Sequence, residues 1–581
     1  MYQDIYYVPK RTGTYSDVLV AYGLATLLDH IFRQVKKPAD RWRIVLEDGG
    51  GHYRVRLSEP VQEGWMDKLT SLRNPAPLII RRGEAADDAP TRDVDETWAQ
   101  VKRWGEQRQA LAEQGVRGTD AEQQLRDLEP PDDWATVVFL GDSRMQADGI
   151  YNRIVSQWAK ACNHLSEHVA TLLALFARPD PDDVALEAWN RLAKRDGIKP
   201  KETASQLLNP HQGKGLNEAK ANALRMDNIK DRPWPEEFLK AVGLWQCLAP
   251  RQTMDTNDWK AYVLAPLRLS WQAHQEAFAR FNRYLWREPG NQTALKTDIT
   301  SVLLFSRAWL DYVEAAWRDE DDFDLPAAPE KVVAGFHVAQ FKLLSRNAYT
   351  MVNLSFLSLP AWSGELHTRA DVMAMQKIID EHLEVIRGID ETHSDGFDLL
   401  RRYRDFVSGG NWEAFFDFAA GYGHEILRRL NDGARFVPTF TTSRLRRLMM
   451  TNRKDLTPIV KNSGFQNVAY AIRHATIIPQ TRKANKQDNL YEVRYGLGAE
   501  LKRKSTVRDE FVAALTDFIQ SYNQENVQKP ESKGQQMRKD VRTDDIVEVV
   551  RLIDEYGSEV VANLLIAYGY AREPREEQSN S

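Results

Sequence analysis

The first 82 residues of the chain contain stretches with the hydrophobic pattern of strands and one stretch with the hydrophobic spacing of a helix. Residues 4–8, residues 42–47 and His52–Leu57 are apolar in the manner of strands, and the Asp-Gly-Gly-Gly sequence at 48–51 predicts a hairpin between the last two. After the first strand, Ser16 is placed to cap a helix whose apolar residues recur at helical spacing. These patterns predict a mixed α/β start over residues 1–82.

A run rich in β-branched and aromatic residues at 134–140 predicts a strand in the next part of the chain. A small polar turn, Gly141-Asp142-Ser143, follows it, and a long helical pattern then continues to residue 175. A strand, a turn and a helix in this order can aim backbone N–H groups at a phosphate. The same order also makes an ordinary βα connection, which is the simpler interpretation.

Residues 209–217 form a loop with a glycine on each side of a lysine: Asn-Pro-His-Gln-Gly-Lys-Gly-Leu-Asn. The residue after Lys214 is glycine rather than Ser or Thr, and no glycine lies five residues before Gly213, so the loop is not a P-loop. Glycines beside a lysine let a backbone approach a phosphate or a base edge. The alternative is a flexible surface loop.

The rest of the chain completes an α+β architecture with a largely helical middle. Residues 83–250 are mixed, whereas residues 251–435 carry aromatic side chains at helical intervals and are expected to be mainly helical. Pro438 marks a hinge, and residues 441–581 are predicted to form a basic C-terminal helical bundle. The predicted domains are therefore 1–435 and 441–581.

The amino-acid composition indicates the cellular compartment of the protein. Sixteen Trp among 581 residues indicate large buried anchors or interfaces, and two cysteines are too few for a disulfide framework or a zinc cluster. No apolar run approaches the ~20 residues that span a bilayer, and the N-terminus lacks the pattern of a signal peptide. We therefore expect a soluble, cytoplasmic protein with no membrane partner.

Positive charge is concentrated in residues 444–504 of an acidic protein. This segment holds fourteen Lys or Arg and four acidic residues, so its charge is +10, whereas the whole chain has a net charge of −5 and the remainder −15. Such asymmetry indicates a polyanionic partner. Four aromatic residues interleave with the charges and are candidates to stack on bases: Phe465, Tyr470, Tyr491 and Tyr495. The alternative is an ordinary solvated basic face.

Familiar catalytic motifs are missing from the sequence. It contains no His-Glu-x-x-His, Cys-x-x-Cys, Gly-x-Ser-x-Gly or Walker A sequence. We therefore expect a binding protein rather than an enzyme, and the sequence suggests no catalytic residue, cofactor or metal ligand.

Three stretches resemble large subunits of type I CRISPR Cascade surveillance complexes, of the I-B or I-A-like group. The first is the Tyr-rich start followed by Ser-Asp-Val-Leu-Val-Ala-Tyr-Gly-Leu-Ala at 16–25, and the second is the loop at 209–217 followed by Trp234 and residues 239–244. The strongest match is 440–483, with Arg-Leu-Arg-Arg-Leu-Met-Met, Gly-Phe-Gln-Asn and Ala-Tyr-Ala-Ile-Arg. The resemblance covers both ends of the chain and one central block.

This resemblance implies a non-catalytic, DNA- and RNA-binding subunit of an antiviral ribonucleoprotein complex. Such a subunit recognises the protospacer-adjacent motif (PAM), helps to open the strands into an R-loop, holds the displaced non-target strand and helps to recruit a helicase–nuclease. Guide pairing supplies the sequence specificity in that arrangement. The implied partners are crRNA, target double-stranded DNA, the helicase–nuclease, and the backbone, handle-capping and small subunits of Cascade.

Two sets of candidate contacts follow from the resemblance. Lys and Asn side chains can address phosphates and base edges, so the candidates for reading the motif are Gly213, Lys214, Gly215 and Asn217, with Arg144 and Gln146 after the upstream turn. Basic side chains neutralise strand phosphates, and the candidates for the strand backbone are Arg446, Arg447, Arg453, Lys454, Arg473, Arg482, Lys483 and Lys486.

The C-terminal bundle is also made as a separate small subunit in several Cascade subtypes. Met449 and Met450 lie at the head of the predicted bundle, and a start at Met449 would leave 133 residues. The alternative is that the two methionines fill the core of an amphipathic helix.

Two other functions fit the sequence. One is a stand-alone nucleic-acid-processing enzyme with an unrecognised active site. The other is a structural adaptor that binds proteins through Trp-rich surfaces.

Overall fold

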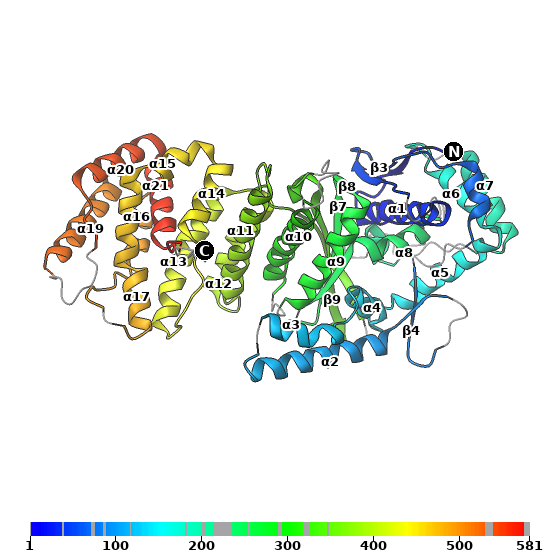
Figure 1. Ribbon diagram of the computed structural model, residues 1–581, viewed down its shortest axis with the longest axis horizontal. Helices are drawn as coiled ribbons and strands as arrows, with labels where there is room; N and C mark the ends of the chain where they lie inside the picture. The colour runs from blue at the N-terminus through cyan, green and yellow to red at the C-terminus, as the bar shows by residue number, and fades with distance from the viewer. Residues whose placement is uncertain are drawn as a thin grey trace, which may run out of the picture. The chain divides into compact units, whose positions relative to one another are not determined.

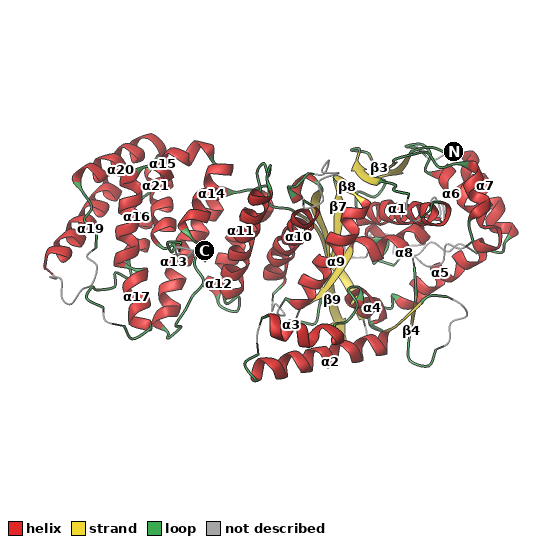
Figure 2. Ribbon diagram, viewed as in Figure 1, coloured by secondary structure: helices red, strands yellow, loops and turns green. Residues whose placement is uncertain are grey.

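The computed structural model divides the chain into two compact units. Unit 1 comprises Met1–Ala294 and Leu304–Leu359, and unit 2 comprises Leu295–Leu303 and Pro360–Ser581. Figure 2 shows strands in unit 1 and helices throughout the described part of unit 2, which confirms the predicted α+β class. The structure describes residues 2–37, 40–70, 76–84, 89–116, 118–180, 183–199, 205–212, 235–253, 256–288, 293–317, 326–345, 348–487, 489–528 and 538–574.

The N-terminal part of unit 1 forms a four-stranded antiparallel sheet. Its order is β1-β3-β2-β8, and its strands are β1 (Ile5–Pro9), β2 (Ile44–Asp48), β3 (His52–Leu57) and β8 (Arg268–Ser270). The turn between β2 and β3 uses Gly50 at φ 83°, a left-handed conformation that costs glycine little. The predicted strands and the hairpin are confirmed.

Helix α1 (Tyr15–Val35) is the buried centre of unit 1, and α8 (Pro235–Cys247) lies beside it (Figure 1). Two glycines bring the backbones into contact. A Cβ on Gly23 would lie 2.0 Å from the carbonyl oxygen of Leu239, and a Cβ on Gly243 would lie 2.0 Å from that of Leu19. The residue that caps α1 is Thr14 rather than the predicted Ser16, which is buried in the first turn.

Among the described residues, only α1 is long and apolar enough to span a membrane by length and composition. The expectation that no apolar run reaches this length is therefore wrong. The protein buries 78% of the apolar window of α1, which is typical of the core helix of a soluble protein.

A second antiparallel sheet lies between residues 248 and 358, in the order β10-β9-β7-β6. Its strands are β6 (Leu248–Gln252), β7 (Trp259–Pro266), β9 (Val333–Ser345) and β10 (Ala348–Ser358). Helices α9–α13, between Trp271 and Asn431, agree with the expectation of a mainly helical region over 251–435, but that expectation does not include these strands. Strand β7 is buried at every position, so it lacks the alternation that identifies a half-exposed strand. The helical spacing correctly marks α9 (Trp271–Arg287) and α10 (Ala294–Ala316).

The described residues between 78 and 195 form two short parallel strands and six α-helices. They are β4 (Leu78–Ile80), β5 (Thr91–Asp93), α2 (Val94–Glu113), α3 (Thr119–Leu125), α4 (Trp134–Gly141), α5 (Asp148–Ala161), α6 (Leu165–Leu175) and α7 (Asp183–Arg195). The predicted strand at 134–140 is therefore the helix α4. Its residues 136–141 are all buried, and an apolar run that is buried on every side does not distinguish a strand from a helix.

Unit 2 is a helical assembly in which α16 packs against α20 and α21, and α13 packs against α21. Its helices are α11 (Arg369–Gly388), α12 (Ser394–Gly409), α13 (Trp412–Asn431), α14 (Thr442–Asn452), α15 (Thr457–Lys461), α16 (Ser463–Ala475), α17 (Ile477–Ala484), α18 (Leu497–Lys504), α19 (Arg508–Gln528), α20 (Thr543–Tyr556) and α21 (Ser558–Gly569). Three of these helices, α11–α13, precede the expected domain start at residue 441.

A buried carboxylate joins α11 to the start of the predicted bundle. Glu381, whose side chain is 2% exposed, accepts a hydrogen bond from the backbone N–H of Thr441 at 3.0 Å. It also pairs with Arg444 at 2.8 Å, and Arg572 lies 3.8 Å away. Met449 is buried in the core. Separate production from Met449 or Met450 stays a prediction, and such a product would lack Glu381.

Candidate nucleic-acid interface

Several arginines of the basic segment 444–504 are already neutralised inside unit 2. Arg447 pairs with Asp371 at 2.8 Å. Arg453 makes two hydrogen bonds, of 3.0 and 2.9 Å, to Asp455 and lies 3.5 Å from Glu413. The bond from Arg453 holds the pKa of the Asp455 carboxyl below its usual value. These predicted phosphate contacts would have to exchange a carboxylate for a phosphate.

Arg473 is a buried structural residue near the end of α16. Its guanidinium donates to the carbonyl oxygens of Tyr568, at 2.7 Å, and Ala571, and it pairs with Glu573 at 2.6 Å. Burial lowers the pKa of Arg473. Because its nitrogens bond the last turn of α21 and the chain that follows it, the geometry does not support the prediction that Arg473 binds a strand phosphate.

A group of unpaired cations lies around the C-terminal end of α17. Lys483 Nζ donates to the hydroxyl of Tyr495 at 3.1 Å, and Asn485 Nδ2 donates to the backbone oxygen of Arg435 at 3.2 Å. These bonds bring the chain before α14 and the chain before α18 next to α17. We call the resulting surface the α17 patch and define it as Arg435, Phe436, Arg482, Lys483, Lys486 and Tyr495. None of its four cations makes an ion pair with a described residue.

Two exposed aromatic rings belong to this patch. Tyr495 is 39% exposed and Phe436 is 60% exposed. The other three predicted stacking residues are already engaged in unit 2. Phe465 is fully buried, Tyr470 stacks on His474 with ring centroids 3.9 Å apart, and the Arg538 guanidinium lies 3.2 Å from the Tyr491 ring centroid. Tyr495 is the most exposed of the four, although the Lys483 ammonium lies 5.7 Å from its ring centroid and its hydroxyl donates to Gln480 at 2.8 Å.

Phe436 is not among the predicted contacts, because it lies two residues before Pro438, which predicts a hinge. The available signal was an aromatic residue directly after Arg435 in a turn-forming stretch. Its exposure depends on where the chain runs between α13 and α14, which the local sequence does not reveal.

The electrostatic environment beside α17 is positive. The pKa of His474 is lowered to about 4, first by burial and then by the charges of Arg538, Arg473 and Arg482. The imidazole is therefore neutral at neutral pH, and it adds no charge of its own to the surface.

The two remaining candidates for the strand backbone lie on or next to α14. Arg446 is half-buried, and its charge acts on the hydroxyl of Tyr568. Lys454 is exposed and makes no ion pair with a described residue.

The candidates for motif reading are only partly described. Gly213, Lys214, Gly215 and Asn217 lie outside the described residues. Just before them, the buried Asn209 bonds Lys240 at 2.8 Å and Glu237 at 3.1 Å on α8. This polar trio fixes the chain on one side of the loop to the helix on its other side.

Arg144 is engaged within unit 1, whereas Gln146 is exposed. Arg144 makes two hydrogen bonds to Asp142, of 2.8 and 2.7 Å, and its guanidinium lies 5.3 Å from the ring centroid of Tyr349. Gln146 adopts φ 51°. Because α4 is a helix, neither the strand–turn–helix phosphate site nor the ordinary βα connection forms upstream of these residues.

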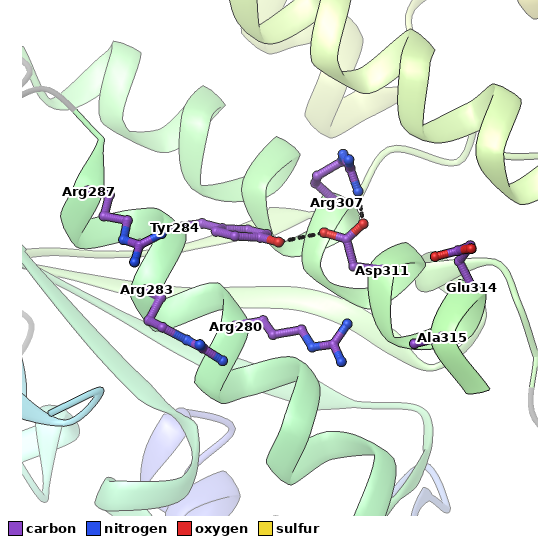
Figure 3. Close-up of a pocket in the computed structure, with 8 residues that line it drawn as sticks. All are labelled: Arg280, Arg283, Tyr284, Arg287, Arg307, Asp311, Glu314 and Ala315. Carbon is purple, nitrogen blue, oxygen red and sulfur yellow. Dashed lines mark hydrogen bonds and ion pairs between the residues drawn. The ribbon is translucent and has the colours of Figure 1, made fainter. Parts of the chain in front are cut away.

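A second cationic feature is a cavity of about 590 Å³ between α9 and α10 of unit 1. Figure 3 shows Arg280, Arg283 and Arg287 projecting from α9, while Arg307 and Asp311 project from α10. Each arginine has a carboxylate partner: Arg280 with Glu276, Arg283 with Asp132, Arg287 with Glu129, and Arg307 with Asp311. The Tyr284 hydroxyl also donates to Asp311 at 2.6 Å. This cavity is a balanced ion-pair network rather than an anion site.

Metal-ligating side chains do not gather in the part of the chain that the structure describes. There, no group of three or more His, Cys, Asp or Glu residues is placed to hold a metal ion. No protein-family model and no curated protein matches the chain.

Proposed function

We propose that this chain is a non-catalytic DNA-binding subunit of a cytoplasmic, crRNA-guided antiviral surveillance complex, akin to the large subunits of type I Cascade. The observation that carries the proposal is the α17 patch, in which hydrogen bonds of Lys483 and Asn485 bring Tyr495 and the backbone of Arg435 beside the cations of α17. Cations that follow a phosphate backbone, combined with rings that stack on bases, bind single strands without sequence preference. A subunit that holds the displaced strand needs this combination.

The proposal divides the work between the two units. Unit 2 holds the displaced strand at the α17 patch, with Lys454 and the exchangeable Arg447 and Arg453 as further phosphate contacts. Unit 1 reads the PAM through residues 213–217, and Gln146 and Arg144 lie upstream of that loop. The partners are crRNA, target double-stranded DNA, the other Cascade subunits and a helicase–nuclease. This assignment to Cascade is supported by the sequence resemblance alone.

Strand binding is tested by measuring the affinity of the full chain for single-stranded DNA at several salt concentrations. Lys483→Ala and Lys486→Ala should each reduce the slope of log affinity against log salt by roughly 0.7, because each removes one phosphate contact. Lys461→Ala is the matched control. Lys461 is also an exposed lysine of the basic segment, but it precedes the N-terminus of α16, whereas α17 follows the C-terminus of that helix. If the three variants have equal slopes, the α17 patch does not bind the strand phosphates.

The Cascade assignment is tested by reconstitution with crRNA and the partner subunits. Lys214→Ala combined with Asn217→Ala should weaken target binding and blur the preference for one motif. If target binding and motif preference are unchanged, residues 213–217 do not read the motif.

Metal-dependent cleavage by the purified chain alone would instead favour the nucleic-acid-processing enzyme. If charge changes at Arg453 and Lys454 leave nucleic-acid binding intact, the adaptor becomes the better interpretation.

A further inference from the structure

Unit 1 contains a cavity of about 530 Å³ that combines aromatic and basic side chains. The chain segments around it come from the end of α1, the approach to β2, the edge strand β8, the start of α9 and the end of α10. Its lining includes Arg33, Arg41, Trp42, Arg43, Arg268 and Tyr312. The volume lies within the range of small-molecule sites and is large enough for one nucleotide.

Trp42 is held in a fixed position at this cavity. Its indole Nε1 donates to Oδ1 of the buried Asp29 at 2.9 Å. Its ring lies nearly parallel to that of Phe32, with centroids 5.8 Å apart and 11° between the planes. Its backbone oxygen accepts a hydrogen bond from Gln272 at 3.1 Å. Because the ring is immobilised before anything binds, a ligand that stacks on it pays little to order it.

The arginines that line this cavity outnumber the acidic residues that line it. Its lining holds four arginines and two aspartates, Asp29 and Asp40, so the lining carries a charge of +2. Asp29 is occupied, since its Oδ2 accepts from Arg33 Nε at 2.7 Å and its Oδ1 accepts from Trp42. Arg41 and Arg268 are exposed and make no ion pair with a described residue. In the cavity between α9 and α10, by contrast, every arginine has a carboxylate partner.

We propose that this cavity binds one nucleotide of a single-stranded nucleic acid. Trp42 and Tyr312 offer aromatic surface to the base, and Arg41 and Arg268 neutralise the flanking phosphates. Asp29 acts as a positioning residue, because it orients both Trp42 and Arg33. The site is in unit 1 and thus separate from the α17 patch, so the proposal goes beyond the holding of a displaced strand by unit 2.

Photocrosslinking of the full chain tests this proposal. The probes are a hexauridylate that carries one 4-thiouridine and a hexathymidylate that carries one 4-thiothymidine. Both are used on a Lys483→Ala, Lys486→Ala background, which weakens binding at the α17 patch. After digestion, mass spectrometry should place the adduct on a peptide that contains Trp42. The probe that reacts more strongly identifies RNA or DNA as the natural source of the nucleotide.

Charge variants provide the second measurement. Arg41→Ala combined with Arg268→Ala should lower the adduct yield and raise the Kd of the hexanucleotide about tenfold, within the range that one lost nucleotide contact produces. Both arginines are exposed, so the melting temperature should not change. Lys102→Ala is the control, because Lys102 lies on α2 of the same unit and is 76% exposed. Adducts of both probes confined to unit 2, or an unchanged Kd in the double arginine variant, would overturn the proposal.

Discussion

At the scale of single residues, the partners of a side chain decide its role more than its charge does. The charge asymmetry of residues 444–504 is visible in the sequence, and it predicts the class of partner. It does not distinguish Arg473, which bonds the last turn of α21, from Lys483, which faces solvent beside Tyr495. Pairing of this kind joins residues about a hundred positions apart, as between Arg473 and Glu573, so no local pattern reports it.

Arg473→Ala should destabilise unit 2 without changing its affinity for single-stranded DNA. The substitution leaves the carbonyl oxygen of Tyr568 without its donor in a buried place, so we expect a loss of about 2 kcal/mol in the free energy of unfolding. Urea denaturation measures the first effect and a binding titration the second. Lys486→Ala should show the opposite pattern, with weaker binding and unchanged stability. Weaker DNA binding by a folded Arg473→Ala variant would show that Arg473 does contact the strand.

His382 should make unit 2 less stable in mild acid. Burial lowers the pKa of this imidazole from 6.5 to about 3, among the rings of Trp362, Phe415 and Phe440. Below pH 6.5 the unfolded chain binds a proton that the folded chain does not, so stability falls as the pH falls. At pH 5 the difference is about 2 kcal/mol.

The measurement for this prediction is the free energy of unfolding at pH 7 and pH 5. His382→Phe removes the titrating group, although it also loses the hydrogen bond of 2.8 Å to the Tyr403 hydroxyl. The variant should be less stable at pH 7, but its stability should change less between the two pH values. An identical pH dependence in both proteins would show that other groups cause the acid sensitivity.

At the scale of elements, the sequence is informative where one face of an element is exposed. Strands β1 and β3 alternate in burial, and their positions and the hairpin between β2 and β3 agree with the prediction. Strand β7 and helix α4 are buried almost throughout, and their apolar runs carry no period. This is why a strand was expected at α4 and a helix at β7. In both cases tertiary packing decided the conformation.

Gly243→Ala should destabilise unit 1 by overpacking the α1–α8 contact. The added methyl group would lie 2.0 Å from the backbone oxygen of Leu19, which no side-chain rotation can relieve, and overpacking typically costs about 1–3 kcal/mol. The melting temperature measures the effect. Gly149→Ala on α5 is the matched control, because nothing lies within 4 Å of its added Cβ. That variant should be neutral or slightly stabilised, since alanine favours a helix over glycine. Equal melting temperatures for the two variants would contradict the packing argument.

At the scale of the whole molecule, the boundary in charge and the boundary in packing do not coincide. The basic segment begins near residue 444, which suggested a domain start at 441, whereas unit 2 is compact from Pro360. Most helices of unit 2 bury one face, whereas α21 is buried at every position from Val561 to Gly569, and the pattern of apolar residues does not show that these helices share one core. The contact of Glu381 with Thr441 and Arg444 is long-range and polar, so it too leaves no trace in the local sequence.

A fragment of residues 360–581 should unfold more cooperatively than the fragment that starts at Met449. The shorter fragment lacks α13, whose Gly423 packs closely against the ring of Tyr570, and it lacks the carboxylate that binds Thr441 and Arg444. Calorimetry of both fragments measures the difference, and we expect a sharp transition only for the longer one. A sharp transition of the Met449 fragment would show that this segment folds alone, and it would favour separate production of the small subunit.

The backbone contact between α1 and α8 makes unit 1 tolerant of a break in the chain. Cleavage between residues 213 and 234 would place α1 and Asn209 on one polypeptide, and α8 with Glu237 and Lys240 on the other. Separation of the two pieces would expose both helices and leave the Lys240 ammonium and the Glu237 carboxylate without Asn209. A nicked protein would therefore migrate as one species under native conditions and as two in denaturant.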